Sequence, residues 1–263
     1  MQHNYFGLIG YPLEHSFSKA FFEQKFAMEK IENVSYKNYP IENINLLPAL
    51  LKKETDLCGF NVTIPYKEAI LPFLDKTSDI AKEIGAVNVV KIDSDKKGIR
   101  FLTGYNTDVF GFEKALLAKT LGTSVSSLWF SAKQKSALIL GTGGAAQAVA
   151  YVLKKLVIDY QFVSRQSNNN TLTYENLDKQ IIENNLLIIN TTPLGMFPNT
   201  DTCPPIPYQG IGTKHFLFDL VYNPEETLFL KKGKERGACV QNGYEMLCYQ
   251  AEAAWKIWNL NPF

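Results

Sequence analysis

The residues best suited to chemistry in this sequence follow short apolar runs that predict strands. Asn61 and Thr63 alternate along one such run, so both side chains face one side of a strand that Pro65 ends. Lys67 comes two residues later, and Asp108 precedes a helical pattern. A lysine beside a carboxylate can hold and exchange a proton, which a carbonyl must gain when it is reduced by a hydride. We interpret Lys67 and Asp108 as a candidate pair for that proton transfer, although Asp108 is also a natural helix N-cap.

Two serines and an asparagine could hold a polar ligand. Ser16 and Ser18 lie two residues apart before a predicted helix, so their hydroxyls and the helix N-terminus together suit a carboxylate. The alternative is that Ser18 only caps the helix. Asn88 interrupts an apolar run, and a buried amide needs a partner there. That partner is either a ligand or the backbone at the strand end.

The last predicted helix carries a further polar group. Gly243, Met246 and Gln250 are spaced by three and four residues and so share one helix face. Gln250 can donate and accept hydrogen bonds, so it would suit substrate hydroxyls. Met246 is interpreted as a packing residue, which would contact a nicotinamide ring if one binds.

A glycine-rich turn indicates a nucleotide site. The segment 141–146 reads GTGGAA, which matches the G-x-G-x-x-G/A fingerprint and lies between a predicted strand and a predicted helix. The backbone at Gly141, Gly143, Gly144 and Ala145 would approach a pyrophosphate, and the helix N-terminus would attract its charge. A plain glycine turn is the alternative.

The next predicted strand indicates which dinucleotide binds. An NAD site places an acid at the carboxyl end of that strand, where this sequence has Ser164 and Arg165. Asp159 precedes the strand and lies at its wrong end. The Arg165 guanidinium can pair a 2′-phosphate, and Ser164 can donate to the same group, so the sequence favours NADP over NAD.

Composition and length bound the class of protein. The chain has 263 residues, 46% hydrophobic and 20% charged, with a net charge of +1. This balance argues against binding to nucleic acid or to an anionic membrane. No leader or membrane-spanning run is evident, so we expect a cytoplasmic protein. The four cysteines form no C-x-x-C pair and the three histidines are scattered, so we expect no metal site and four buried free thiols.

Predicted strands alternate with predicted helices along the whole chain, which is typical of α/β folds. We expect two α/β domains: an N-terminal substrate domain with a mainly parallel sheet, and a C-terminal Rossmann-like dinucleotide-binding domain. The boundary is predicted near residue 112. Periodicity alone leaves open which domain the final helix joins.

With these motifs assembled, the chain resembles the shikimate dehydrogenase family, which includes quinate/shikimate dehydrogenases, along nearly its whole length. The motifs that carry the resemblance are HSFS at 15–18, NVTIPYK at 61–67, GAVN at 85–88, NTD at 106–108, GTGGA at 141–145, NTTPLGM at 190–196, DLVYNP at 219–224, and Gly243 with Gln250.

The resemblance implies NADPH-dependent, reversible reduction of 3-dehydroshikimate to shikimate, a step toward chorismate and the aromatic amino acids. It implies a catalytic domain of residues 1–112 completed by a C-terminal helix at 241–263, a cofactor domain of residues 113–240, and an active site in the cleft between them. Lys67 and Asp108 would be catalytic. The substrate-binding residues would be Ser16, Ser18, Asn61, Thr63, Asn88, Tyr222 and Gln250. The cofactor-binding residues would be Gly141, Gly143, Gly144, Ala145, Ser164, Arg165, Thr191, Thr192, Gly243 and Met246.

Two alternative functions stay open at this point. Relaxed use of quinate and of NAD is one, because the family often has Asn-Arg-Thr where this chain has Ser164, Arg165 and Gln166. A non-catalytic metabolite sensor on the same fold is another, against which the presence of both Lys67 and Asp108 argues. The expected partner is a small-molecule substrate, and the chain could act as a monomer or a homodimer.

Overall fold

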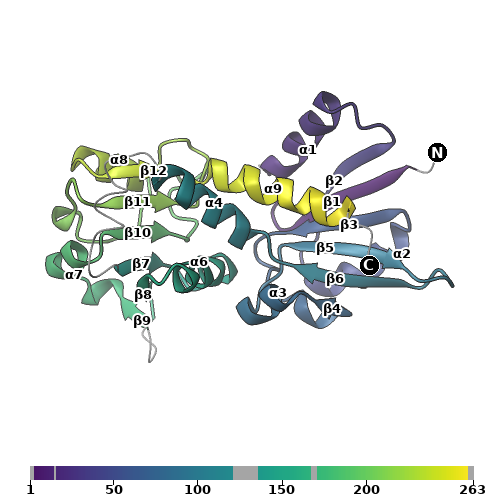
Figure 1. Ribbon diagram of the computed structural model, residues 1–263, viewed down its shortest axis with the longest axis horizontal. Coiled ribbons are helices and arrows are strands. Elements are labelled where there is room, and N and C mark those ends of the chain that lie inside the picture. The colour runs from purple at the N-terminus through teal and green to yellow at the C-terminus, as the bar shows by residue number, and fades with distance from the viewer. Residues whose placement is uncertain (1–2, 15, 121–135, 167–170, 260–263) are drawn as a thin grey trace. The chain divides into compact units, whose positions relative to one another are not determined.

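A computed structural model describes residues 3–14, 16–120, 136–166 and 171–259 of the chain. Its contacts divide it into two compact units, each an α/β structure as predicted (Figure 1). The first unit contains the chain up to Thr107 together with the segment from Gln250 onward. The second unit runs from Asp108 to Tyr249.

The first unit is built on a mixed sheet with the order β2-β1-β3-β5-β6-β4 among the described residues. Its parallel half consists of β2, β1 and β3, and β5 runs antiparallel to both β3 and β6. In the parallel half, Leu8 of β1 pairs with Asn38 of β2 and Asn61 of β3. The strands are β1 (Asn4–Gly10), β2 (Val34–Pro40), β3 (Leu57–Val62), β4 (Lys76–Thr77), β5 (Val89–Ser94) and β6 (Arg100–Tyr105).

Helices cover both faces of this first sheet. One face packs against α1 and the end of α9 in a core that includes Phe22, Ala254 and Trp258. The other face packs against α2 and α3 in a core that includes Leu47 and Ala81. Burying both faces explains the apolar strand runs in the sequence. The helices are α1 (Phe17–Met28), α2 (Leu47–Lys53), α3 (Asp79–Ile84) and α9 (Tyr244–Asn259), with short 3-10 turns η1 (Ile44–Leu46) and η2 (Leu71–Phe73).

The second unit is a parallel sheet with the order β12-β11-β10-β7-β8-β9 in the described part of the chain. The strands are β7 (Ser136–Leu140), β8 (Asp159–Ser164), β9 (Thr171–Thr173), β10 (Leu187–Asn190), β11 (Phe216–Asp219) and β12 (Cys239–Gln241). From β7 the chain adds strands first on one side (β8, β9) and then on the other (β10, β11, β12). Such a reversal marks the place where open α/β sheets bind ligands. The strand before the glycine turn, β7, and the strand before Arg165, β8, are neighbours at this place.

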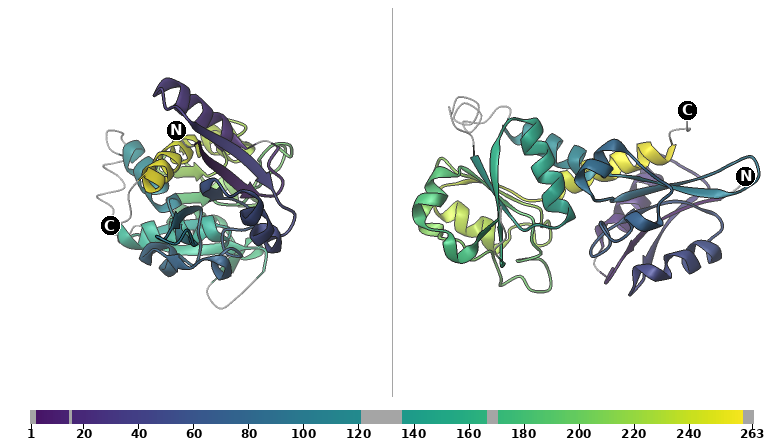
Figure 2. Two further views of the ribbon diagram at one scale, coloured as in Figure 1. Left: turned by 90° about the vertical axis from the view of Figure 1, so that its right-hand side faces the viewer. Right: turned by 90° about the horizontal axis from the view of Figure 1, so that it is seen from below.

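Helices also lie on both faces of the second sheet (Figure 2). Helices α7 and α8 cover a core that contains Leu140, Ile182 and Phe229. On α4, the Phe112 ring meets Phe218 of β11 edge-on with centroids 5.1 Å apart. These elements are α4 (Asp108–Thr120), α6 (Gly144–Lys155), α7 (Lys179–Asn184) and α8 (Leu228–Glu235), with η3 (Tyr174–Asn176) and η4 (Tyr208–Gly210).

Several element boundaries differ from the sequence predictions. Asp159 was expected to precede β8, but it is the first residue of that strand. It still lies at the amino end of β8, whereas Arg165 follows the carboxyl end. β5 begins at Val89, so Asn88 precedes the strand instead of interrupting it. The final helix begins at Tyr244, so Gly243 lies before it and shares no helix face with Met246 and Gln250.

All four cysteines are free, but each is partly exposed rather than buried as predicted. Within the described residues, no helix is long and apolar enough to cross a membrane. The same residues contain no group of three or more His, Cys, Asp or Glu side chains that could hold a metal ion.

Candidate active site

The two serines lie at the start of α1, and Ser16 caps this helix. Ser16 is the N-cap, and its hydroxyl oxygen accepts the Ser18 N–H at 3.3 Å. The alternative in which Ser18 caps the helix is therefore wrong. Both residues are half-buried, and their hydroxyls lie where the α1 dipole favours a negative charge.

Asn61 and Thr63 lie at the carboxyl end of β3, as the alternation predicts. Asn61 is buried, and its Nδ2 donates to the Asn88 carbonyl at 3.3 Å. Thr63 follows the strand and continues its pairing, because its N–H donates to the Ile9 carbonyl at 2.9 Å. The Asn61 Oδ1 accepts a hydrogen bond at 2.7 Å from the hydroxyl of Tyr36, a residue that the sequence analysis missed.

The turn that carries Lys67 is fixed at both ends by backbone hydrogen bonds. The Tyr66 N–H donates to the Thr63 carbonyl at 2.9 Å, and the Lys67 carbonyl accepts the Val87 N–H at 2.7 Å. Lys67 is half-buried. The backbone of the candidate catalytic lysine is thus attached to the residue that precedes Asn88.

Asn88 joins three segments of the first unit. It is 2% exposed, and its Nδ2 donates at 3.0 Å both to the Thr107 Oγ1 and to the Gln250 Oε1. Its Oδ1 accepts the Thr107 N–H at 2.7 Å. The buried Asn88 amide thus has protein groups among its partners. Its bond to the Gln250 Oε1 positions that side chain of α9. Thr107 belongs to the NTD motif at 106–108, but we did not predict it as a site residue, because a single threonine has no distinctive sequence pattern.

Asp108 follows Thr107 directly and is the first residue of α4. It is 4% exposed, and the first turn of a helix is a favourable place for a carboxylate. Lys67 belongs to the first unit and Asp108 opens the second. Their pairing stays a prediction.

The glycine turn of the second unit connects β7 to α6. Gly141 has a φ of +113°, and a Cβ there would lie 2.5 Å from the Thr191 Oγ1. Gly143 is the N-cap of α6, and no side chain caps the helix. A Cβ on Gly143 would meet nothing within 4 Å. The start of α6 is thus uncapped by any side chain, and there is open space beside Gly143.

Thr191 and Thr192 shape the loop after β10. The Thr191 hydroxyl donates to the Leu140 carbonyl at 2.7 Å, which holds this loop against the end of β7. The Thr192 hydroxyl donates to the Asn190 Oδ1 at 2.6 Å. In turn the Asn190 Nδ2 donates to Asp219 at 2.9 Å. The two threonines thus position the loop next to the glycine turn.

Asp219 is a fully buried carboxyl group that the sequence analysis did not select by itself. Burial raises the pKa of Asp219 to about 7, although hydrogen bonds from Thr227, Val221 and Asn190 act to lower it. The Thr227 hydroxyl donates to Oδ2 at 2.6 Å, and the Val221 N–H donates to Oδ1 at 3.0 Å. Asp219 therefore joins the loops that follow β10 and β11.

Ser164 and Arg165 lie at the carboxyl end of β8, beside the glycine turn. The Gly141 N–H donates to the Val163 carbonyl at 2.8 Å. The Ser164 hydroxyl donates to the Gln166 carbonyl at 2.7 Å and accepts the Gln166 N–H at 3.1 Å. Ser164 thus holds the turn that presents Arg165, and its hydroxyl must rotate before it can donate to a phosphate. The Arg165 side chain is exposed.

Gly243 and Met246 lie at the start of α9, and Tyr222 lies in the loop after β11. A Cβ on Gly243 would lie 2.1 Å from the Leu220 carbonyl oxygen, so only glycine fits this backbone approach. The Gly243 N–H donates to the Val221 carbonyl at 3.1 Å. Met246 is buried, in agreement with a packing role, and Tyr222 is half-buried.

Comparison with known proteins places these features in one family. A family model described as the shikimate dehydrogenase substrate binding domain matches residues 8–90. A shikimate dehydrogenase (NADP(+)) of Methanococcus maripaludis is 39% identical over 96% of this chain and 90% of its own length. A protein of the same name from Desulforamulus reducens is 35% identical over 96% of this chain and 88% of its own.

Solved structures agree with the sequence relatives. The shikimate 5-dehydrogenase of Thermus thermophilus, in complex with NADP(H) and shikimate, superposes with a TM-score of 0.81 at 30% identity. That match covers 99% of this chain and 95% of the other. A quinate dehydrogenase of Corynebacterium glutamicum in complex with NAD superposes with a TM-score of 0.80 at 28% identity, covering all of this chain and 96% of the other.

Proposed function

This chain belongs to the shikimate dehydrogenase family, and from that premise we propose that it catalyses the reversible, NADPH-dependent reduction of 3-dehydroshikimate to shikimate. The substrate offers a carboxylate, ring hydroxyls and one carbonyl. Each of these groups has a chemical counterpart among the residues described above.

Ser16 and Ser18 bind the substrate carboxylate. Their hydroxyls and the N-terminal dipole of α1 together form a donor set for an anion. Asn61, Thr63, Asn88 and Gln250 hold the ring hydroxyls, with Tyr222 contributing from the loop after β11. Three of these side chains, those of Asn61, Asn88 and Gln250, have hydrogen-bond partners within the first unit that restrict their orientation.

Lys67 and Asp108 manage the proton. The Lys67 ammonium donates to the carbonyl oxygen as negative charge develops there, and the Asp108 carboxylate orients the ammonium. The observation that carries this assignment is the hydrogen-bonded path around Asn88. Lys67 is attached to Val87, the residue before Asn88, and the Asn88 side chain is attached to Thr107, the residue before Asp108.

The residues of the second unit fit the pyrophosphate and 2′-phosphate of NADPH. The uncapped start of α6 and the open space at Gly143 suit the pyrophosphate, and the exposed Arg165 suits the 2′-phosphate. Thr191, Thr192, Gly243 and Met246 would line the rest of the site, and Ser164 would support Arg165. When bound, the cofactor supplies the hydride.

Oxidation of NADPH by the purified protein with 3-dehydroshikimate tests the activity, and folded protein without turnover would refute it. Parallel assays with quinate and with NAD measure whether substrate and cofactor use is relaxed. Lys67→Ala should lose most of its kcat while its affinity for shikimate changes little. Lys82→Ala, at an exposed position of α3, is the matched control and should keep both. A Lys67→Ala variant with near-normal kcat would reject the proton-transfer role.

We also propose that the enzyme works in the cytoplasm as a monomer or a homodimer. Four free thiols fit a reducing compartment. Light scattering of the purified protein distinguishes the two assemblies.

A further inference from the structure

We propose that Tyr36 is a positioning residue that sets the orientation of Asn61 for substrate binding. The inference rests on the proposed function, in which Asn61 contacts the substrate. Tyr36 lies on the face of β2 that packs against α1 and α9.

The Tyr36 ring is fixed by packing. It is 2% exposed and stacks on Phe22 of α1, with ring centroids 4.6 Å apart and planes 15° apart. The Trp258 ring lies 6.3 Å away at the end of α9. Because aromatic rings of three elements pack together here, the hydroxyl at the tip of Tyr36 has a fixed position.

The hydroxyl of Tyr36 bonds to one of the predicted substrate-binding residues. It has one proton, which it donates to the Asn61 Oδ1 at 2.7 Å. Burial raises the pKa of Tyr36 well above its ordinary value, so the hydroxyl keeps its proton at any working pH.

This arrangement determines which atoms of Asn61 are donors. With Oδ1 engaged by Tyr36, the Asn61 amide nitrogen points the other way and donates to the Asn88 carbonyl at 3.3 Å. The hydrogen bonds thus run from Tyr36 through Asn61 to Asn88, whose side chain bonds Gln250. Tyr36 is therefore connected to the glutamine end of the proposed substrate site.

The decisive variant is Tyr36→Phe, which keeps the ring and removes the hydroxyl. We expect KM for 3-dehydroshikimate to rise roughly tenfold, because the buried Asn61 acceptor loses its hydrogen bond and its fixed orientation. KM for NADPH and kcat should change less than twofold. The matched control is Tyr39→Phe, on the opposite face of β2, whose hydroxyl donates to Glu54 at 3.0 Å. It should leave both KM values unchanged.

A double-mutant cycle tests whether Tyr36 acts through Asn61. Asn61→Ala combined with Tyr36→Phe should cost less than the product of the two single effects. If Tyr36→Phe does not fold, Phe22→Leu decides instead, because it keeps every hydroxyl but removes the stacked ring and should raise the same KM several-fold. A substrate KM at or below that of the wild type in the variant used, or multiplicative effects in the cycle, would overturn the inference. Failure of the proposed function is distinct from these results, because it appears as absent turnover in the wild type.

Discussion

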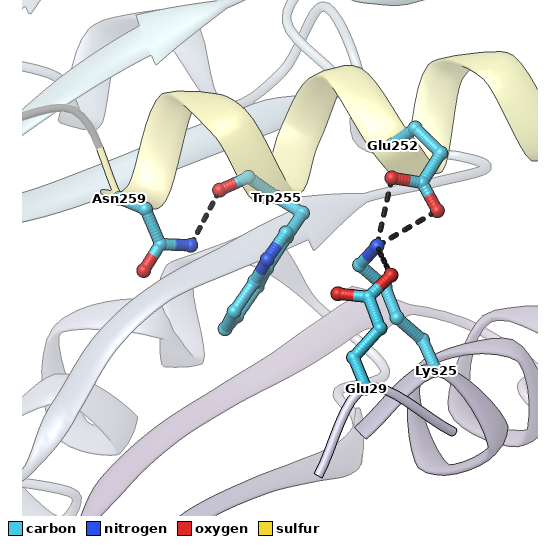
Figure 3. Close-up of polar contacts among 5 residues, drawn as sticks. All are labelled: Lys25, Glu29, Glu252, Trp255 and Asn259. Carbon is cyan, nitrogen blue, oxygen red and sulfur yellow. Dashed lines mark hydrogen bonds and ion pairs between the residues drawn. The ribbon is translucent and has the colours of Figure 1, made fainter. Parts of the chain in front are cut away.

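Lys25 of α1 and Glu252 of α9 form a partly buried ion pair between segments far apart in the sequence. The Lys25 Nζ lies 2.8 and 3.0 Å from the two carboxylate oxygens of Glu252 and 2.6 Å from the Glu29 Oε1 (Figure 3). Burial acts to lower the pKa of Lys25, but its bonds to Glu252 and Glu29 raise it overall above its ordinary value. The pair therefore attaches the helix that Ser16 caps to the helix that carries Gln250.

Glu252→Ala should lower the free energy of unfolding by about 1 kcal/mol, because Glu29 remains as a partner and Glu252 is partly exposed. Urea denaturation at low and at high salt measures this loss. Glu23→Ala is the matched control, since its pair with Lys19 is exposed on both sides and should contribute less than about 0.5 kcal/mol. Equal losses in the two variants would contradict a specific role for the Lys25 pair.

Two glycines of the second unit should respond to alanine in opposite ways. Gly143→Ala should fold like the wild type, because its φ of −77° suits alanine and its Cβ meets no protein atom. It should raise KM for NADPH at least roughly tenfold, because the methyl group occupies the pyrophosphate position. Gly243→Ala should instead lower the melting temperature, since its Cβ would collide with the Leu220 backbone. Thermal melts and NADPH titrations distinguish the two effects.

Arg165→Gln should weaken the preference for NADPH over NADH. Loss of a guanidinium–phosphate pair should reduce kcat/KM for NADPH roughly 100-fold, with little change for NADH. The fold should be unaffected, because the side chain is exposed. Steady-state kinetics with both cofactors measure the ratio, and an unchanged ratio would remove Arg165 from the cofactor site.

Asp219 should make stability depend on pH. Its pKa is about 7 in the folded chain against an ordinary value of 3.8, so between these values the folded chain holds a proton that the unfolded chain has released. The free energy of unfolding should therefore fall as pH rises from about 4 to 7 and then level off.

Asp219→Asn is the reference for this effect, because its amide mimics the protonated carboxyl and can donate to Thr227. Relative to this variant, the wild type should lose up to about 4 kcal/mol across the window. Urea denaturation of both proteins at a series of pH values measures the difference, and parallel curves would contradict the prediction.

Local sequence patterns were sufficient for much of the fold. Alternating apolar runs and helical periodicity identified the two α/β units, because burial on both faces of a sheet imposes that pattern on nearby residues. The strand, glycine turn and helix at β7 and α6 were equally visible, since the turn needs a positive φ at Gly141 that glycine adopts readily. Short elements such as β12, with three residues, offered too little periodicity to detect.

The contacts among distant residues were decided only by tertiary structure. Nothing near Tyr36 in the sequence marks its hydroxyl as a partner of Asn61, 25 residues away, because a tyrosine in a buried strand looks like core. In the same way, Lys25 looks like a surface lysine until α9 brings Glu252 beside it. The sequence by itself determined which chemical groups are present and which local elements carry them. Tertiary packing decided which of them share hydrogen bonds, because a side-chain contact depends on distance in space, which local periodicity does not encode.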